Sequence, residues 1–179
     1  MNTKKINIKH FVYTRLKKSS MADFSLGKHC QSRELLADVF VAFKVKKDPF
    51  SIQYNEVVSE GLWSLSHTEY ASCIGFIPCD SKYNIQSLGV DIESVNRIIP
   101  EVLKKKYILD EDFSYNELTI WVVKEAIFKA ISKVVKFTFD LSDILISKET
   151  FRFIPNQKIG GEFSFWNEKD FIIAGAIIR

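Results

Sequence analysis

The stretch SLGVDIESVNR, residues 87–97, places two acidic residues inside a short apolar run. Val90 and Ile92 alternate with Asp91 and Glu93, and this period of two is typical of a strand. On a strand the two carboxylates share one face, with their Cα atoms about 6.5 Å apart. Two interpretations follow: an edge strand with one wet face, or a strand whose acidic face binds a positive group.

The composition predicts a globular protein. The chain has 179 residues, of which 46% are hydrophobic, and this is enough to bury a core in one domain or in two small joined halves. No apolar run reaches the roughly 18 residues that a membrane span requires. The N-terminal segment has scattered charges and lacks the continuous apolar segment of a secretory signal. We therefore expect a cytoplasmic protein with no membrane partner.

The cysteines, the histidines and the net charge do not favour a disulfide-rich, zinc-binding or nucleic-acid-binding protein. Cys30, Cys73 and Cys79 form no CxxC pair, and an odd number without a secretory signal argues against a disulfide framework. The three histidines are too dispersed to indicate a zinc site. A net charge of +3 is too small by itself to indicate nucleic-acid binding, although the N-terminal third is locally basic.

Periodicity along the chain predicts a mixture of helices and strands. The expected helices are an amphipathic one over 33–46, one over 101–109 after Pro100, and a longer one over 117–135. The expected strands are a hairpin within 61–77, the acidic strand, and strands within 137–156 and 160–179 with a glycine turn at Gly160 and Gly161. Because the order of helix then strands occurs twice, a duplicated α+β unit is a further hypothesis.

The helix expected over 117–135 carries an acid and a base on the side opposite its core stripe. Glu125 and Lys129 are four residues apart, and such a pair is commonly a surface ion pair of modest strength. Here Trp121 and Val122 flank the same charges, which favours a partly covered cleft, and a carboxylate in a cleft needs a partner. The core stripe consists of Ile120, Val123, Ile127, Ala130, Ile131 and Val134.

Three carboxylates, on Asp91, Glu93 and Glu125, therefore require a positive group. Hard oxygen ligands suit Mg²⁺ or Mn²⁺, and Mg²⁺ commonly takes its remaining ligands from water and substrate phosphates. Lys129 would supply a point charge to the same phosphates. The pattern indicates metal-assisted phosphoryl or phosphodiester chemistry.

The order and spacing of these motifs resemble the 4'-phosphopantetheinyl transferases, in particular the monomeric type that activates surfactin and enterobactin synthetases. GVDIE (89–93) is similar to the family's acidic strand motif, and WVVKEAIFKA (121–130) is similar to its helix motif. LWSLSHTEYASCIGF (62–76) resembles the strand that precedes them, and SRELLADVFVAFK (32–44) resembles an N-terminal helix of the family. The resemblance covers about residues 30–179, although the Gly-Lys-Pro element of many members is absent.

The resemblance implies two pseudo-symmetric α+β halves, residues 1–86 and 87–179, packed as one body with coenzyme A between them. It implies that Asp91, Glu93 and Glu125 bind Mg²⁺ together with the pyrophosphate of coenzyme A. The N-terminal half would bind the adenosine and 3'-phosphate side, and the C-terminal half would hold the metal and the catalytic groups Glu125, Lys129 and Glu93. The residues implied to contact coenzyme A are Arg33, Ser66, His67, Lys124 and Lys129.

Several of these residues also have an ordinary structural interpretation. His67, taken alone, is more often a satisfied strand histidine than a ligand, and Arg33 has only its place on the N-terminal helix to support it. Lys124 is either phosphate-facing or structural. The run Lys104 to Lys106 is by default a solvated helix face, and it is also a candidate docking surface for an acidic carrier protein.

The implied reaction transfers the phosphopantetheine arm of coenzyme A to a serine of an apo acyl or peptidyl carrier protein, and it releases adenosine 3',5'-bisphosphate. Glu125 is the first candidate for the base that takes the serine proton, and Glu93 is the second. The alternatives are a non-catalytic paralogue that binds coenzyme A or a carrier protein, and a basic nucleic-acid-binding protein, which the mild charge disfavours. With both halves in one chain we expect a monomer.

Overall fold

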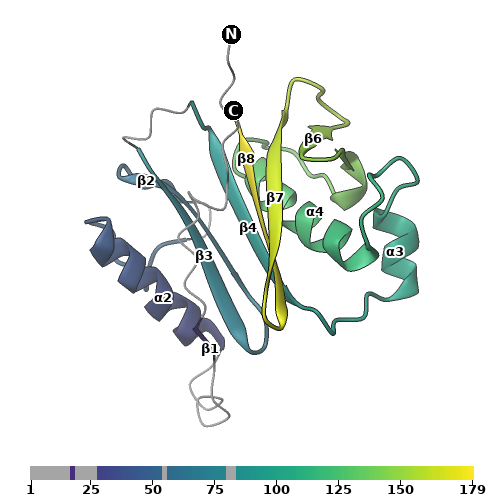
Figure 1. Cartoon of the computed structure of the whole chain (residues 1–179). Coiled ribbons are helices and arrows are strands. Elements are labelled where there is room, and N and C mark those ends of the chain that lie inside the picture. Colours follow the sequence, from purple (N-terminus) through teal and green to yellow (C-terminus); the bar gives the residue numbers. More distant parts are fainter. Residues whose placement is uncertain (1–16, 19–27, 54–55, 80–83) are drawn as a thin grey trace.

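Figure 1 shows a computed structural model of the chain, which describes residues 17–18, 28–53, 56–79 and 84–179. The described residues form two antiparallel sheets with helices packed against them, which confirms the predicted α+β class. The strand order is β1-β3-β2 in the first sheet and β4-β8-β7-β6-β5 in the second. The pseudo-symmetry of the two halves stays a prediction. Most of the basic N-terminal stretch and the side chain of Cys30 lie outside the described part of the chain.

The first sheet contains the hairpin that the sequence predicts. Strand β2 (Gly61–His67) pairs with β3 (Ala71–Pro78), from Gly61 opposite Pro78 to His67 opposite Ser72. The short strand β1 (Lys17–Lys18) pairs with the other edge of β3. Helix α2 (Lys28–Ala42) covers this sheet. The core between them consists of Leu35, Leu36, Val39, Phe40, Ile52, Val58, Trp63, Leu65, Ile74 and Phe76.

Helix α2 ends before residue 46, where the sequence pattern placed its end. Lys44 adopts a left-handed conformation with φ of 55°, and its backbone N–H donates to the carbonyl of Val41. The N–H of Val45 donates to the carbonyl of Phe40 at 2.8 Å. This is the paired hydrogen-bond pattern that terminates many helices, with Lys44 at the position that glycine usually takes. Apolar residues continue past the helix because Phe43 and Val45 pack on the same core.

The second sheet contains the acidic strand at its edge. Strand β4 (Ser87–Ser94) pairs with β8 (Phe171–Ile178), which is followed in the sheet by β7 (Gly160–Glu168), β6 (Thr150–Phe153) and β5 (Ile144–Ile146). Val90 and Ile92 point toward the hairpin and pack against Cys73 and Ile77. The opposite face of the sheet is covered by helix α4 (Glu117–Ile131), with α3 (Glu101–Tyr107) next to it.

Asn116 caps the N-terminus of helix α4. Its side-chain oxygen accepts a hydrogen bond from the backbone N–H of Thr119 at 2.8 Å. Its predicted core stripe is buried, except for Val134, which lies beyond the helix end and is half-buried. Trp121, Val122 and Lys124 are buried as well, so α4 is enclosed on more than one side. No helix in the described ranges has the length and apolar character needed to cross a bilayer.

The predicted glycine turn at Gly160 and Gly161 is wrong, because both residues lie in strand β7. Gly161 pairs with Phe151 on one side and Ile178 on the other. A Cβ at Gly161 would lie 1.9 Å from the carbonyl oxygen of Ile177, so glycine is required there by close strand packing. The connection between β6 and β7 lies instead at residues 154–159, directly before the two glycines.

Candidate functional site

A cavity of about 400 Å³ lies where β2, β4 and α4 meet. It brings together residues from both sheets that are distant in sequence, and Lys133 and Ser132 contribute to it from the turn after α4. The predicted site residues that line it are Ser66, His67, Asp91, Glu93, Glu125 and Lys129. The sequence motifs therefore converge on one place in the structure.

The glycine of the GVDIE motif allows α4 to approach β4 closely. A Cβ at Gly89 would lie 1.9 Å from the carbonyl oxygen of Ala126 and 2.6 Å from the backbone nitrogen of Ala130. The hydroxyl of Ser87 donates to the carbonyl oxygen of Ala130 at 2.7 Å. Helix backbone thus rests directly on strand backbone, which places Glu125 and Lys129 beside the acidic face of the strand.

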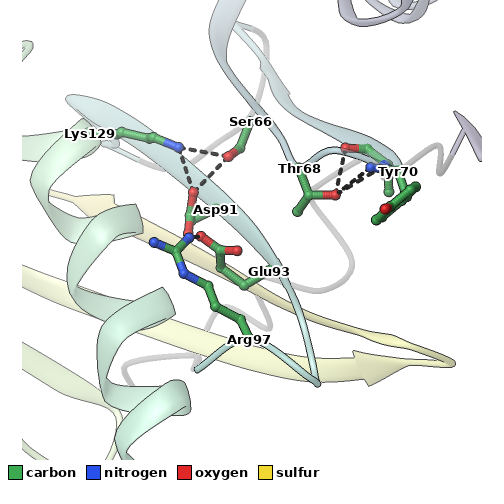
Figure 2. Close-up of polar contacts among 8 residues, drawn as sticks. Ser66, Thr68, Tyr70, Asp91, Glu93, Arg97 and Lys129 are labelled. Carbon is green, nitrogen blue, oxygen red and sulfur yellow. Dashed lines mark hydrogen bonds and ion pairs between the residues drawn. The ribbon is translucent and has the colours of Figure 1, made fainter. Parts of the chain in front are cut away.

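Asp91 is 5% exposed and lies at the centre of this arrangement. Its Oδ1 accepts hydrogen bonds from the Ser66 hydroxyl at 2.7 Å and from Lys129 Nζ at 2.6 Å (Figure 2). Lys129 also donates to the Ser66 hydroxyl at 2.8 Å, which closes a triangle. Strand β4 is an edge strand, but a wet acidic face is the wrong interpretation because Asp91 is covered.

The second oxygen of Asp91 is different from the first. Asp91 Oδ2 is buried, and no described residue hydrogen-bonds to it. A buried carboxylate oxygen without a partner is costly, and native structures rarely keep one without a role. This oxygen is therefore a candidate contact for a cation or a substrate group.

Glu93 forms an ion pair with Arg97, a residue that the sequence analysis did not single out (Figure 2). The guanidinium of Arg97 also lies 5.4 Å from the ring centroid of Trp121, within the range of a cation–π contact. The sequence signal that could have identified Arg97 is its position four residues after Glu93, at the end of the acidic strand.

Glu125 is half-buried and approaches Asp91 from the helix side. Burial raises the pKa of Glu125, and the negative charge of Asp91 raises it further, while Lys129 and Arg97 act in the opposite direction. Its carboxylate makes no hydrogen bond or ion pair with any residue in the described ranges. Glu125 is therefore an acid–base group that faces the cavity and holds its proton more tightly than an ordinary glutamate.

Lys133 is a site residue that the sequence analysis missed. Its Nζ donates to the carbonyl oxygens of Trp63 on β2 and Leu88 on β4, the latter at 2.8 Å, and so ties the two sheets together. Burial lowers the pKa of Lys133 to about 8, with a smaller contribution from the charge of Lys129. Its position was visible as the third member of a series with Glu125 and Lys129, each four residues apart.

Lys124 and Arg33 are not brought to the cavity. Lys124 is 1% exposed, pairs with Asp112 at 2.6 Å, and donates to the carbonyl of Tyr107 at 2.8 Å. Arg33 donates to the carbonyls of Pro49 at 2.9 Å and Ile52 at 2.7 Å. Both contacts support the structural interpretation of these two residues rather than contact with coenzyme A.

The lysine run on α3 also lies outside this cavity. Lys104 pairs with Glu117 at 2.6 Å, and Lys106 pairs with Asp140 at 3.3 Å. Lys105 is exposed. These contacts fit a solvated helix face, and the docking surface stays a prediction.

The residues of the cavity fit a divalent cation in their donor chemistry. Three carboxylates line the same space, and Asp91 Oδ2 has no hydrogen-bond partner among the residues that the structure describes. Their present arrangement is held by ion pairs, since Lys129 binds Asp91 and Arg97 binds Glu93. Accordingly, the described residues contain no ready-made group of three metal-ligating side chains. A cation entering here would compete with those two pairs.

In comparisons with known proteins, no family model matches the chain, and no curated protein matches it. The case for a function therefore comes from the geometry of this cavity and from the motifs that build it.

Proposed function

We propose that this chain transfers the phosphopantetheine arm of coenzyme A to a serine of an apo carrier protein, in a Mg²⁺-dependent reaction that releases adenosine 3',5'-bisphosphate. The observation that supports this most is the shared cavity of two motifs. Asp91 and Glu93 of the strand motif line the same space as Glu125 and Lys129 of the helix motif. The resemblance to phosphopantetheinyl transferases assigns both motifs to a single site.

The reaction places specific demands on the side chains. The serine oxygen forms a bond to the phosphorus that bears the pantetheine, and the bond from that phosphorus to the bridging oxygen breaks, so that the adenosine bisphosphate leaves. Lys129 would neutralise the pyrophosphate by exchanging its contact with Asp91 for one with a phosphate oxygen. Mg²⁺, held by Asp91, Glu93 and Glu125, would supply Lewis-acid neutralisation of the same charge when bound.

Glu125 is the favoured base for the serine proton. It faces the cavity without a pairing cation of its own in the described part of the chain, whereas Glu93 is engaged by Arg97. The positive charge of Mg²⁺ would favour the ionised form of Glu125, which is the form that can accept the serine proton. Glu93 remains the second candidate.

The first sheet would bind the other end of coenzyme A. Ser66 and His67 end strand β2 and line the cavity from the side opposite α4. His67 would contact the 3'-phosphate side, as the resemblance implies. Since one chain provides both sides of the cavity, we propose that the protein acts as a cytoplasmic monomer.

The test is direct transfer. The protein is incubated with coenzyme A, Mg²⁺ and several apo acyl and peptidyl carrier proteins, and each carrier is weighed by mass spectrometry. We expect an added phosphopantetheine on at least one carrier, and no addition with Asp91→Asn or after removal of divalent cations. Absence of the added mass on every carrier would contradict the proposal.

A second candidate is a non-catalytic protein that binds coenzyme A. It is favoured by one observation, namely that Asp91 and Glu93 are already paired with Lys129 and Arg97. Calorimetry with coenzyme A, with and without Mg²⁺, separates the two candidates. Binding that is unaffected by Mg²⁺, without any transfer, would favour this second function.

A further inference from the structure

Arg97 lies where the chain leaves the acidic strand. Its backbone N–H donates to the carbonyl of Ser94 at 3.0 Å, so the chain turns directly after β4. The turn brings the side chain back toward the strand, where the guanidinium forms an ion pair with Glu93 (Figure 2). The Glu93 side chain is only 14% exposed. One of the three carboxylates of the cavity therefore has a counter-ion that belongs to the chain itself.

The Trp121 ring holds the other side of this guanidinium. The centre of the guanidinium lies 5.4 Å from the ring centroid, within the range of a cation–π contact. The ring is itself fixed, because Trp121 is buried on α4 and Tyr107 packs edge-on against it at 6.1 Å between centroids. Arg97 is thus held between a carboxylate and a fixed aromatic ring, which distinguishes it from an ordinary surface arginine.

The charge of Arg97 also acts on Glu125 across the cavity. Burial raises the pKa of Glu125, whereas the charges of Lys129 and Arg97 lower it. Lys129 in turn pairs with Asp91 at 2.6 Å. Two internal cations therefore serve the three carboxylates. A divalent cation bound by these carboxylates must displace Arg97 from Glu93, and it meets a positive charge that stays close by.

Coenzyme A would change this balance, because its pyrophosphate brings negative charge to the same place. Lys129 lines the cavity, so its ammonium could leave Asp91 for a phosphate oxygen. The same negative charge offsets the repulsion between Arg97 and a divalent cation at Glu93. The cation and the pyrophosphate should therefore each favour binding of the other, and such a coupling is reciprocal.

We propose that Arg97 is an internal counter-ion of the acidic face, which prevents tight binding of a divalent cation at Glu93 and Glu125 until the pyrophosphate of coenzyme A is present. The inference rests on the proposed function, since it concerns the order in which that function assembles its site. Arg97 acts here on the affinity for the cation and takes no part in the transfer itself.

The test measures binding of Mn²⁺, which suits the same oxygen ligands as Mg²⁺ and gives an electron paramagnetic resonance signal that is lost on binding. Mn²⁺ is titrated in 0.1 M salt into the wild-type chain and into Arg97→Gln. Repulsion between a guanidinium and a neighbouring divalent cation, even when weakened as in bulk water, corresponds to about a tenfold change in Kd. We expect Arg97→Gln to bind Mn²⁺ about tenfold more tightly than wild type without coenzyme A.

The titrations are then repeated with saturating coenzyme A, with protein-free mixtures as the reference for Mn²⁺ that coenzyme A binds by itself. The difference between wild type and Arg97→Gln should fall below about threefold, because the pyrophosphate offsets the charge of Arg97. Coenzyme A should therefore strengthen Mn²⁺ binding more in wild type than in the variant.

Three further variants separate charge from structure. Arg97→Lys keeps the charge and should resemble wild type. Arg97→Met keeps the aliphatic stem without the charge and takes the place of Arg97→Gln if that variant does not fold. Arg152→Gln is the matched control for net charge, because Arg152 is exposed on β6, three strands or about 14 Å from β4, beyond the screening length at this salt concentration. It should leave Mn²⁺ binding unchanged.

The outcomes distinguish this inference from the proposed function. If wild type binds Mn²⁺ with coenzyme A but Arg97→Gln has the same affinity without coenzyme A, the inference is overturned and the proposed function stands. A difference that coenzyme A does not reduce overturns it as well. If no variant binds Mn²⁺ under either condition, the proposed metal site fails and the inference fails with it. A tenfold difference that coenzyme A removes supports both.

Discussion

Two lysine–aspartate pairs on different sides of α4 have the same N···O distance of 2.6 Å and very different surroundings. In the first, Asp112 pairs with Lys124 and also accepts the backbone N–H groups of Leu109 at 2.8 Å and Ile146 at 3.1 Å. Both carboxylate oxygens are used, and both side chains are almost fully buried. This pair fastens α4 to the segment between α3 and α4 and to strand β5.

The second pair, between Lys129 and Asp91, has one carboxylate oxygen without a partner in the described residues and lies beside a cavity; we call it the open pair. Ser66 and Lys129 use only one oxygen of Asp91, and the side chain of Lys129 is 30% exposed at the edge of a cavity. The difference teaches that burial of a charge pair does not by itself indicate a role. A pair with every lone pair satisfied stabilises the fold, whereas a pair with a spare buried oxygen beside a cavity has capacity for a ligand.

The largest effect is expected where the closed pair is broken. Asp112→Asn leaves the Lys124 ammonium buried without its counter-charge, which should lower the free energy of unfolding by about 3 to 5 kcal/mol. Urea denaturation measures this. The double variant Lys124→Met/Asp112→Asn removes the buried charge and should recover much of the loss. A stability equal to wild type in the single variant would contradict the structural role of this pair.

The equivalent change in the pair of Lys129 and Asp91 should affect transfer activity strongly and stability little. Asp91→Asn keeps the shape of the side chain and leaves Lys129 partly exposed to water, so the free energy of unfolding should change little. Phosphopantetheine transfer should lose about 100- to 1,000-fold in kcat/KM, the range found when a group that stabilises transition-state charge is removed. A stable and fully active Asp91→Asn chain would remove Asp91 from the proposed site.

Lys133 lies between these two cases, because it is a half-buried structural donor that also lines the cavity. Lys133→Met deprives the carbonyls of Trp63 and Leu88 of a donor, and we expect a loss of about 1 to 3 kcal/mol in the free energy of unfolding. The folded-state pKa of about 8 is below the ordinary value of 10.5, so the folded chain releases this proton first. The stability of wild type relative to Lys133→Met should therefore rise between about pH 8 and pH 10.5.

The smallest effect concerns the pH dependence of Glu125. The pKa of Glu125 is raised in the chain without Mg²⁺, mainly by burial, so the effect is measured as thermal unfolding in the absence of divalent cations. The folded state binds this proton more tightly than the unfolded state, so the contribution of Glu125 to stability is greatest at low pH and declines as pH rises through the folded pKa. Glu125→Gln should gain in Tm relative to wild type as pH increases. A pH-independent difference in Tm would refute the shift.

The sequence predicted the elements of the site better than the ends of the elements. The acidic strand, the hairpin and the helix with Glu125 and Lys129 all lie where alternation and helical spacing indicate. The place of Gly161 was mispredicted because it depends on close packing against Ile177, which a local pattern does not contain. The end of α2 was mispredicted because Phe43 and Val45 continue the apolar pattern beyond the helix while packing on the same core.

The roles of individual charges show the same division. Lys124, Lys129 and Lys133 lie on one helix and the turn that follows it. Their spacing does not indicate that Lys124 forms a buried ion pair with Asp112, or that Lys133 bridges strands β2 and β4. Sequence reasoning chose Lys124 for the site and omitted Lys133, because the partner of a charge is set by long-range contacts.

By itself the sequence determined that two acids share one strand face and that an acid and a base share one helix face, since these follow from the periods of strand and helix. Only the tertiary structure decided that the two faces meet. Gly89 lets the backbone of α4 rest on β4, and the burial that results leaves one oxygen of Asp91 without a partner in the described ranges of the chain. The edge strand is covered because the hairpin and the helix together exclude water from it, and that exclusion is a property of the assembled fold.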